Sequence, residues 1–171
     1  DPASPFYGLI KRMSTRTMPE AVVIDSAIIE MIRVSLKNPN GALAPFRSLG
    51  RGPSDTEGMY RILVDYWKGV SSVFDTAWGL PPTASRLMHS TGIRAMGVLM
   101  DRIVARAIGH AEPLRHIVTS LHRISPHCRW TSGVWEDLGL EWNEIEQTPR
   151  HIRQLSQLLC HLDYTAQRDV T

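Results

Sequence analysis

The chain has 171 residues, which suits one domain with a substantial core. Hydrophobic residues make up 43% of it and charged residues 21%, so the composition is that of a soluble globular chain and excludes a disordered one. The formal net charge of +2 is compatible with nucleic-acid binding without indicating it, because a binding face depends on how charges cluster. Sixteen of the nineteen basic residues are arginines, which suit bidentate contacts with phosphate or carboxylate, although arginine-rich usage also follows from a GC-rich genome.

No apolar run approaches the length of a membrane-spanning helix, so a transmembrane segment is excluded. No signal peptide is recognisable, and two cysteines do not make a disulfide framework in a chain of this size. We therefore expect a cytoplasmic protein. The beginning, "DPASPFYG", has no initiator Met and looks like a cut inside a longer protein, of which residues 1–171 would form a single helical domain.

The first predicted helix begins near Glu20 and ends at the Asn, Pro and Gly of "KNPNG". Its apolar positions follow a helical spacing up to Leu36. Because the segment is rich in β-branched residues, a short extended segment at Ala21 to Ile24 is the alternative. Residues 38–54 are then predicted to be a flexible internal loop, since "SLGRGPSD" is rich in Gly, Ser and Pro.

Two helices are expected next. Ser54 and Glu57 form a capping-box pattern that opens the first of them, and the sequence "WGLPP" ends it. The second is a central helix from Ser85 to about Ala107. Its core face would hold Ile93, Met96, Leu99, Met100 and Ile103.

A shorter helix at residues 113–124 and a Trp-rich connector follow, and Thr148 with Pro149 opens the last helix. No alternating strand pattern and no internal repeat is present. The sequence therefore predicts an all-α fold, an irregular bundle of about five to six helices, with the short extended segment near the N-terminus as the alternative noted above.

Two pairs of metal-binding residue types, His127–Cys128 and Cys160–His161, suggest four ligands for zinc. Adjacent ligands are not the usual spacing, and neighbours on a helix point about a hundred degrees apart. Cys160 stands next to a Leu-rich face and is most simply a core residue. P-loop and Gly-x-Gly-x-x-Gly patterns are absent as well, so we predict no metal site and no cofactor.

The stretch "PPTASRLMHSTGIRAMGVLMDRI" carries the main candidate site. In a helix that starts near Ser85, Arg86, Ser90 and Arg94 lie at four-residue steps on one face, with His89 beside them. This polar stripe (Arg86, His89, Ser90 and Arg94) suits contact with a phosphate backbone. A helix start also carries unpaired N–H groups, so we expect its first turn to be exposed and any anion to bind near Arg86, His89 or Arg94.

A structural use of the same stretch is the alternative. The arginines would then pair with Asp65, Asp75 or Asp101 on a solvated or interhelical face. In addition, Gly92 and Gly97 suggest a close helix crossing.

The connector contains Trp130, Trp135 and Trp142, interleaved with His127 and Arg129. Such a mixture suits the stacking of unpaired bases. Acidic neighbours would repel nucleic acid, however, so we expect these large residues to anchor an irregular connector to the helical core.

Two longer stretches, "AWGLPPTASRLMHSTGIRAMGVLMDRI" and "CRWTSGVWEDLGLEWNEIEQTPRHIRQLSQLL", resemble the carboxy-terminal helical half of the DGQHR-domain family. The leading "SPFYGLIKRMSTRTMPEAVVIDS" is similar to the segment that follows the family's motif region. Members occur near bacterial DNA-modification and phage-defence genes, including phosphorothioation systems. The Asp-Gly-Gln-His-Arg motif that names the family does not occur in these 171 residues. Its ParB-like relatives imply DNA binding or nucleoside-related chemistry by analogy of fold.

Three functions follow as hypotheses. The leading one is a DNA-associated accessory or regulatory module of a bacterial DNA-modification or phage-defence system, with the polar stripe on phosphate. The second is a structural and interaction module that packs on the amino-terminal half of the same protein, or that dimerises through the face of Gly92 and Gly97. The third is an enzyme active site shared with that half, with His89 or His127 as an acid–base group.

Overall fold

The structure, a computed structural model, describes residues 1–11, 21–48, 50 and 52–168. It is mostly helical, with about 59% of the described residues in α-helices or 3-10 turns. The α-helices of the described part are α1 (Asp25–Lys37), α2 (Thr56–Val73), α3 (Ser90–Ala107), α4 (Pro113–Ile124) and α5 (Pro149–Arg168). None of the described helices is both long and apolar enough to cross a lipid bilayer.

Short elements connect these helices. The strands are β1 (Ile10–Lys11) and β2 (Val23–Ile24), which pair in parallel, and β3 (Val134–Trp135) and β4 (Leu140–Glu141), which pair antiparallel. The single 3-10 turns are η1 (Ala44–Phe46), η2 (Ser125–His127), η3 (Glu136–Leu138) and η4 (Trp142–Glu144). The prediction of a helical chain is confirmed, but an all-α description leaves out the two strand pairs. The first helix begins only at Asp25, after β2, so Val23 and Ile24 are extended as the alternative had it.

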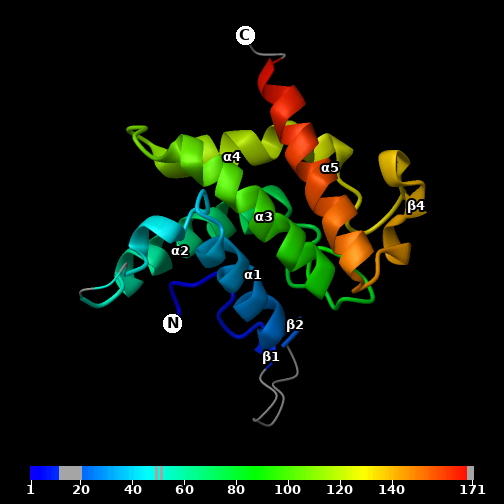
Figure 1. Cartoon of the computed structure of the whole chain (residues 1–171). Coiled ribbons are helices and arrows are strands. Elements are labelled where there is room, and N and C mark those ends of the chain that lie inside the picture. The colour runs from blue at the N-terminus through cyan, green and yellow to red at the C-terminus, as the bar shows by residue number, and fades with distance from the viewer. Residues whose placement is uncertain (12–20, 49, 51, 169–171) are drawn as a thin grey trace.

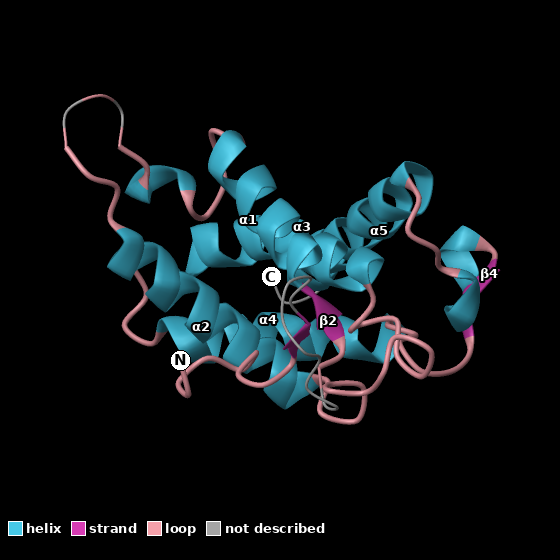
Figure 2. Cartoon of the chain, turned by 90° about the horizontal axis from the view of Figure 1, so that it is seen from below, coloured by secondary structure: helices cyan, strands magenta, loops and turns pink. Residues whose placement is uncertain are grey.

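Helix α3 is the axis of the fold (Figure 1). It packs against α1, α4 and α5, and Figure 2 shows α1 and α5 on either side of it. Thirteen of its eighteen residues are buried, including the whole predicted core face. Helix α2 is joined to it by Tyr66, whose buried hydroxyl donates to the Met96 carbonyl at 2.7 Å.

The crossing of α1 and α3 depends on Gly97. A Cβ atom added there would lie 2.1 Å from Cγ of Met31, so only glycine lets the two helices approach this closely. The predicted close crossing is therefore confirmed at Gly97. At Gly92 the close neighbour is different, because a Cβ would meet the Arg86 carbonyl oxygen at 2.0 Å. Both glycines are buried inside the chain, so a dimer would have to use another face.

Two predicted helix starts are wrong, each for a local reason. Helix α3 begins at Ser90 and not at Ser85, because the Arg86 N–H donates to the Trp130 carbonyl at 2.8 Å and so leaves the helical ladder. Helix α2 is capped by Asp55, whose carboxylate accepts from the Gly58 N–H at 2.8 Å. Ser54 instead accepts from the Ser48 N–H at 3.2 Å.

Asp101 of α3 joins α1, the loop after it and α3 at one point. Its buried carboxylate accepts from the Ser35 hydroxyl at 2.6 Å, from the Ala42 N–H at 2.9 Å and from the Asn38 side-chain amide at 3.3 Å. The Ser35 oxygen in turn accepts from the Leu43 N–H at 3.2 Å. No cation pairs with Asp101 among the described residues, so neutral donors alone compensate its charge.

The predicted flexible loop, residues 38–54, therefore begins with a fixed part. Ala42 and Leu43 are buried, and η1 continues the segment with a turn. Leu49 and Arg51 lie outside the described residues. The flexibility of the rest of the loop stays a prediction.

Replacing Asp101 by alanine is expected to lower the free energy of unfolding by about 2–4 kcal/mol, because buried donors on Ser35 and Ala42 would lose their acceptor. Asp101→Asn should cost less, since its carbonyl oxygen still accepts one bond. Urea denaturation measures both changes. Asp137→Ala, at an exposed carboxylate, is the control and should stay within about 0.5 kcal/mol of the parent. Equal stability of Asp101→Ala and Asp137→Ala would contradict this role.

Candidate functional site

Arg86 is half-buried and serves the fold internally. One guanidinium nitrogen donates to the Pro82 carbonyl and another to the Asn143 carbonyl, each at 2.6 Å. It therefore holds the turn before α3 against the Trp-rich connector. Both terminal guanidinium nitrogens, which would contact a phosphate, therefore already donate to carbonyl oxygens of the chain.

His89 is the N-cap of α3, and its Nδ1 accepts from the Thr91 N–H at 3.3 Å. Burial lowers the pKa of the imidazole, and the neighbouring Arg86 guanidinium lowers it further. The neutral ring that results is the form able to cap the helix. Ser90 is buried, so its hydroxyl is not presented to solvent.

Arg94 is the member of the polar stripe that is left for a partner. It is half-buried on α3, and no acceptor is paired with its side chain in the part of the chain that the structure describes. The prediction that the stripe shares one helix face is wrong, because Arg86 and His89 precede the helix. The first turn of α3 is also covered and not open, since Ser90, Thr91 and Gly92 are buried.

The predicted arginine–aspartate pairs are wrong as well. Asp101 bonds to the loop after α1, as described above, and the buried carboxylate that pairs with arginine is Asp163 of α5. Arg106 approaches it at 2.7 Å and Arg102 at 4.0 Å. These pairs connect α3 to α5.

The tryptophans of the connector are structural, as predicted. Trp130 and Trp135 are buried and pack edge to face, with ring centroids 5.1 Å apart, and Trp142 is half-buried. Thr91 adds a further tie, because its hydroxyl donates to the Glu146 carbonyl at 2.8 Å. Arg86 before α3 and Thr91 in its first turn thus hold the connector against this helix.

The His and Cys residues are not assembled into a centre. No group of three or more His, Cys, Asp or Glu side chains is placed to hold a metal ion among the residues with described structure. Burial raises the pKa of the Cys128 thiol to about 12 and that of the Cys160 thiol to about 11. Cys160 lines a surface groove and does not lie in the core, so that prediction is wrong. His127 is exposed.

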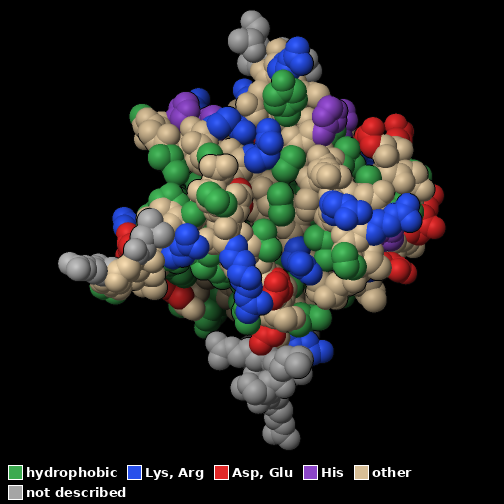
Figure 3. All heavy atoms as spheres, viewed as in Figure 1, with side chains coloured by type: hydrophobic (Ala, Val, Ile, Leu, Met, Phe, Trp, Pro, Cys, Tyr) green, Lys and Arg blue, Asp and Glu red, His purple; other side chains and the backbone are tan. Residues whose placement is uncertain are grey.

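Charge is segregated on the surface. Helices α1, α3 and α5 carry eight Lys or Arg and four carboxylates, of which Asp101 and Asp163 are buried. We call the surface of these three helices the basic face; Figure 3 shows its Lys and Arg side chains in blue. Many of the acidic side chains gather at the right edge of that view, over the connector, and others lie at the left and beside the Lys and Arg side chains below the centre. This acidic edge consists of Glu136, Asp137, Glu141, Glu144 and Glu146, all exposed.

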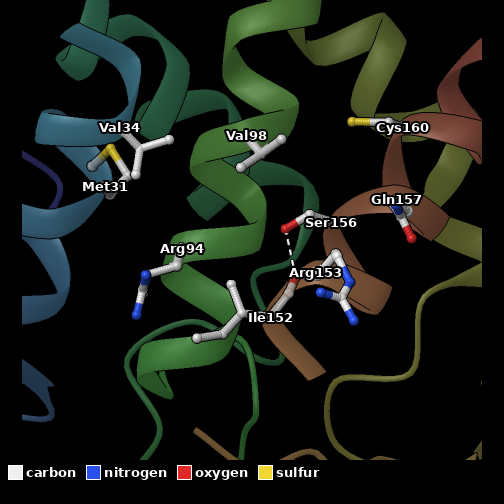
Figure 4. A pocket seen from close by; sticks show the side chains of 9 residues that line it. All are labelled: Met31, Val34, Arg94, Val98, Ile152, Arg153, Ser156, Gln157 and Cys160. Atoms are coloured by element: carbon white, nitrogen blue, oxygen red, sulfur yellow. Dashed lines mark hydrogen bonds between the residues drawn. The ribbon is translucent and has the colours of Figure 1, made fainter. Parts of the chain in front are cut away.

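An apolar groove runs along the middle of the basic face, with a volume of about 380 Å³. Met31 and Val34 of α1 line one side, and Ile152 and Cys160 of α5 line the other, with Val98 of α3 between them (Figure 4). Sequence reasoning missed this groove and its second arginine, Arg153. The scarcity of accessible carboxylates on the first, third and fifth helices is a signal that could have indicated the face.

The chain matches no protein-family model, no curated protein and no solved structure. The resemblance to the DGQHR-domain family therefore stays an expectation.

The lowered pKa of His89 predicts a pH effect on stability. The unfolded chain binds a proton near the ordinary histidine pKa of about 6.5, while folded His89 resists it. Neutral His89 therefore contributes fully to the free energy of unfolding above that pH. The contribution is lost as the pH falls toward the lowered pKa of folded His89. In His89→Asn, which keeps a capping oxygen, the free energy of unfolding should fall less between neutral and mildly acidic pH. At pH 8 it should lie within about 0.5 kcal/mol of the parent.

Chemical denaturation at a series of pH values measures this difference. His161→Asn, at an exposed histidine of α5, is the control and should leave the pH profile unchanged. A His89→Asn profile that coincides with the parent's would count against the assignment.

Proposed function

We propose that this chain is a DNA-associated accessory or regulatory module, and that it contacts the phosphate backbone through the basic face. The observation that carries the proposal is the segregation of charge, which a net charge of +2 conceals. Phosphate contacts by Lys and Arg supply most sequence-independent DNA affinity. Its setting in a bacterial DNA-modification or phage-defence system rests on the resemblance to the DGQHR-domain family.

Of the polar stripe, only Arg94 would contact phosphate directly. The other phosphate contacts would come from arginines of α5. Arg94, Arg150 and Arg153 have no partner among the described residues, so their guanidinium groups are available. Arg86, His89 and Ser90 would act indirectly by fixing the start of α3. The acidic edge repels phosphate and so restricts the contact to one side of the molecule.

A second candidate, an interaction module, is favoured by α1. This helix buries Ala27, Met31 and Ser35 against the rest of the chain. On its other sides it leaves Ile29 51% exposed and Val34 41% exposed. Apolar surface of this kind is typical of a helix that another part of the protein, or another chain, covers.

Gel-shift or anisotropy titrations of duplex DNA against salt test the DNA proposal. We expect binding at low salt and a triple variant, Arg94→Ala with Arg150→Ala and Arg153→Ala, that lowers the salt slope by about 3 and the affinity at least about tenfold. The control is Arg61→Ala with Lys68→Ala, at exposed cations of α2 away from this face. Absence of binding at low salt, or equal losses in the two variants, would reject the proposal.

A further inference from the structure

The central helix leaves one line of residues uncovered between α1 and α5. Arg94, Val98, Arg102 and Ala105 follow one another at steps of four, four and three positions, which places them on one side of α3. Val98 and Arg94 are half-buried, whereas Arg102 and Ala105 are exposed. Arg94 and Val98 of this line form the floor of the groove, and α1 and α5 are its walls.

The walls offer apolar surface and few free polar groups. On α1 the apolar side chain of Val34 is 41% exposed. On α5 the Ser156 hydroxyl donates to the Ile152 carbonyl at 2.6 Å, so it is already satisfied within its own helix (Figure 4). A ligand of this surface gains mainly from apolar contact, and the groove's polar lining consists of Gln157 and the two arginines besides this satisfied hydroxyl.

Two unpaired positive charges flank this apolar surface. Arg94 and Arg153 both line the groove, and in Figure 4 they lie on opposite sides of Ile152. Neither has an acceptor or a carboxylate partner among the residues described. The groove is thus complementary to a ligand with an apolar stripe and negative charge along its edges.

We propose that the groove binds an amphipathic, acidic helix of a protein partner. Such a helix presents apolar side chains at i, i+3, i+4 and i+7 and carboxylates beside them, and it would lie over α3 as a further helix of the bundle. A second copy of the chain has no acidic helix in its described part. Its α1 and α2 carry as many Lys and Arg as Asp and Glu residues, α3 and α5 carry more, and α4 carries no carboxylate. Its acidic edge consists of single turns too short to fill the groove.

The acidic helix and DNA would compete, because Arg94 and Arg153 belong to both surfaces. This regulatory consequence rests on the proposed DNA-binding function, whereas the docking of the helix does not. A partner of this kind would release the chain from DNA by occupying its arginines.

The test uses a fluorescent synthetic helical peptide of about 18 residues, or five turns, with Leu along one face and Glu on both flanks. One twin replaces every Glu by Lys, and another replaces every Leu by Ser. Anisotropy titrations should show the acidic peptide binding at least about tenfold tighter than either twin, a difference of about 1.4 kcal/mol. Binding no tighter than that of the twins would overturn the proposal.

Variants of the chain show whether the peptide binds in the groove. Val34→Asn with Val98→Asn should weaken peptide binding at least about tenfold and leave DNA affinity unchanged, while Arg94→Ala with Arg153→Ala should weaken both. Leu114→Asn, at a 41% exposed leucine of α4, is the matched control and should change neither. Circular dichroism checks that each variant is folded.

The outcomes separate the two proposals. Peptide binding without DNA binding supports the docking site and rejects the DNA function. DNA binding without peptide binding supports the DNA function and rejects the docking site. Peptide affinity unchanged by Val34→Asn with Val98→Asn would overturn the site. So would light scattering that shows a dimer of the parent chain and a monomer of this variant, because the occupant would then be a second copy.

Discussion

A carboxylate buried on the central helix governs how the first third of the chain meets the rest. Asp101 is compensated by a hydroxyl, an amide and a backbone N–H, and each comes from the end of α1 or the loop after it. Burying a charge without a cation is tolerated only when such donors are fixed in place. The loop must therefore return to α3, and α1 must lie at the angle that brings Ser35 to this point. Gly97 makes that angle possible, because no side chain separates the two helices.

The arginines divide into two groups by what they contact. Arg86, Arg102 and Arg106 are used within the chain, on carbonyls or on Asp163. Arg94 and Arg153 have no such partner and flank the groove. Some arginines thus connect segments of the chain to one another, while others supply accessible positive charge beside the groove. Position relative to acceptors within the chain, and not the number of arginines, decides which use is made of each.

Helical periodicity was sufficient to predict the helices and the core face of α3, because those positions repeat locally. It failed at residues 85–89, where the backbone follows the Trp130 carbonyl instead of the helix. That partner lies more than forty positions away in the sequence, so no local pattern contains it. The same reason applies to Asp101, whose donors lie on α1 and in the loop after it. Ser54 and Asp55 are equally good caps by type, and only the loop geometry selects Asp55.

The groove escaped prediction because it depends on three helices that are not consecutive in the chain. Its residues alternate between core and surface roles: Met31 packs on Gly97 and also lines the groove. A pattern that marks apolar positions does not say whether a neighbour covers them. The face could be anticipated only in its charge, because these helices carry twice as many Lys and Arg as carboxylates and bury two of the four carboxylates.

The ties between the connector and the start of α3 have a consequence at longer range. Arg86 and Thr91 hold the carbonyls of Asn143 and Glu146, so the acidic edge keeps a fixed position relative to the basic face. Two opposite charge clusters on a rigid frame give the molecule a permanent dipole moment. Near a polyanion such a molecule experiences a torque that turns its basic face forward before any contact forms. The architecture of the connector would thus influence the rate of productive encounters more than the strength of the final complex.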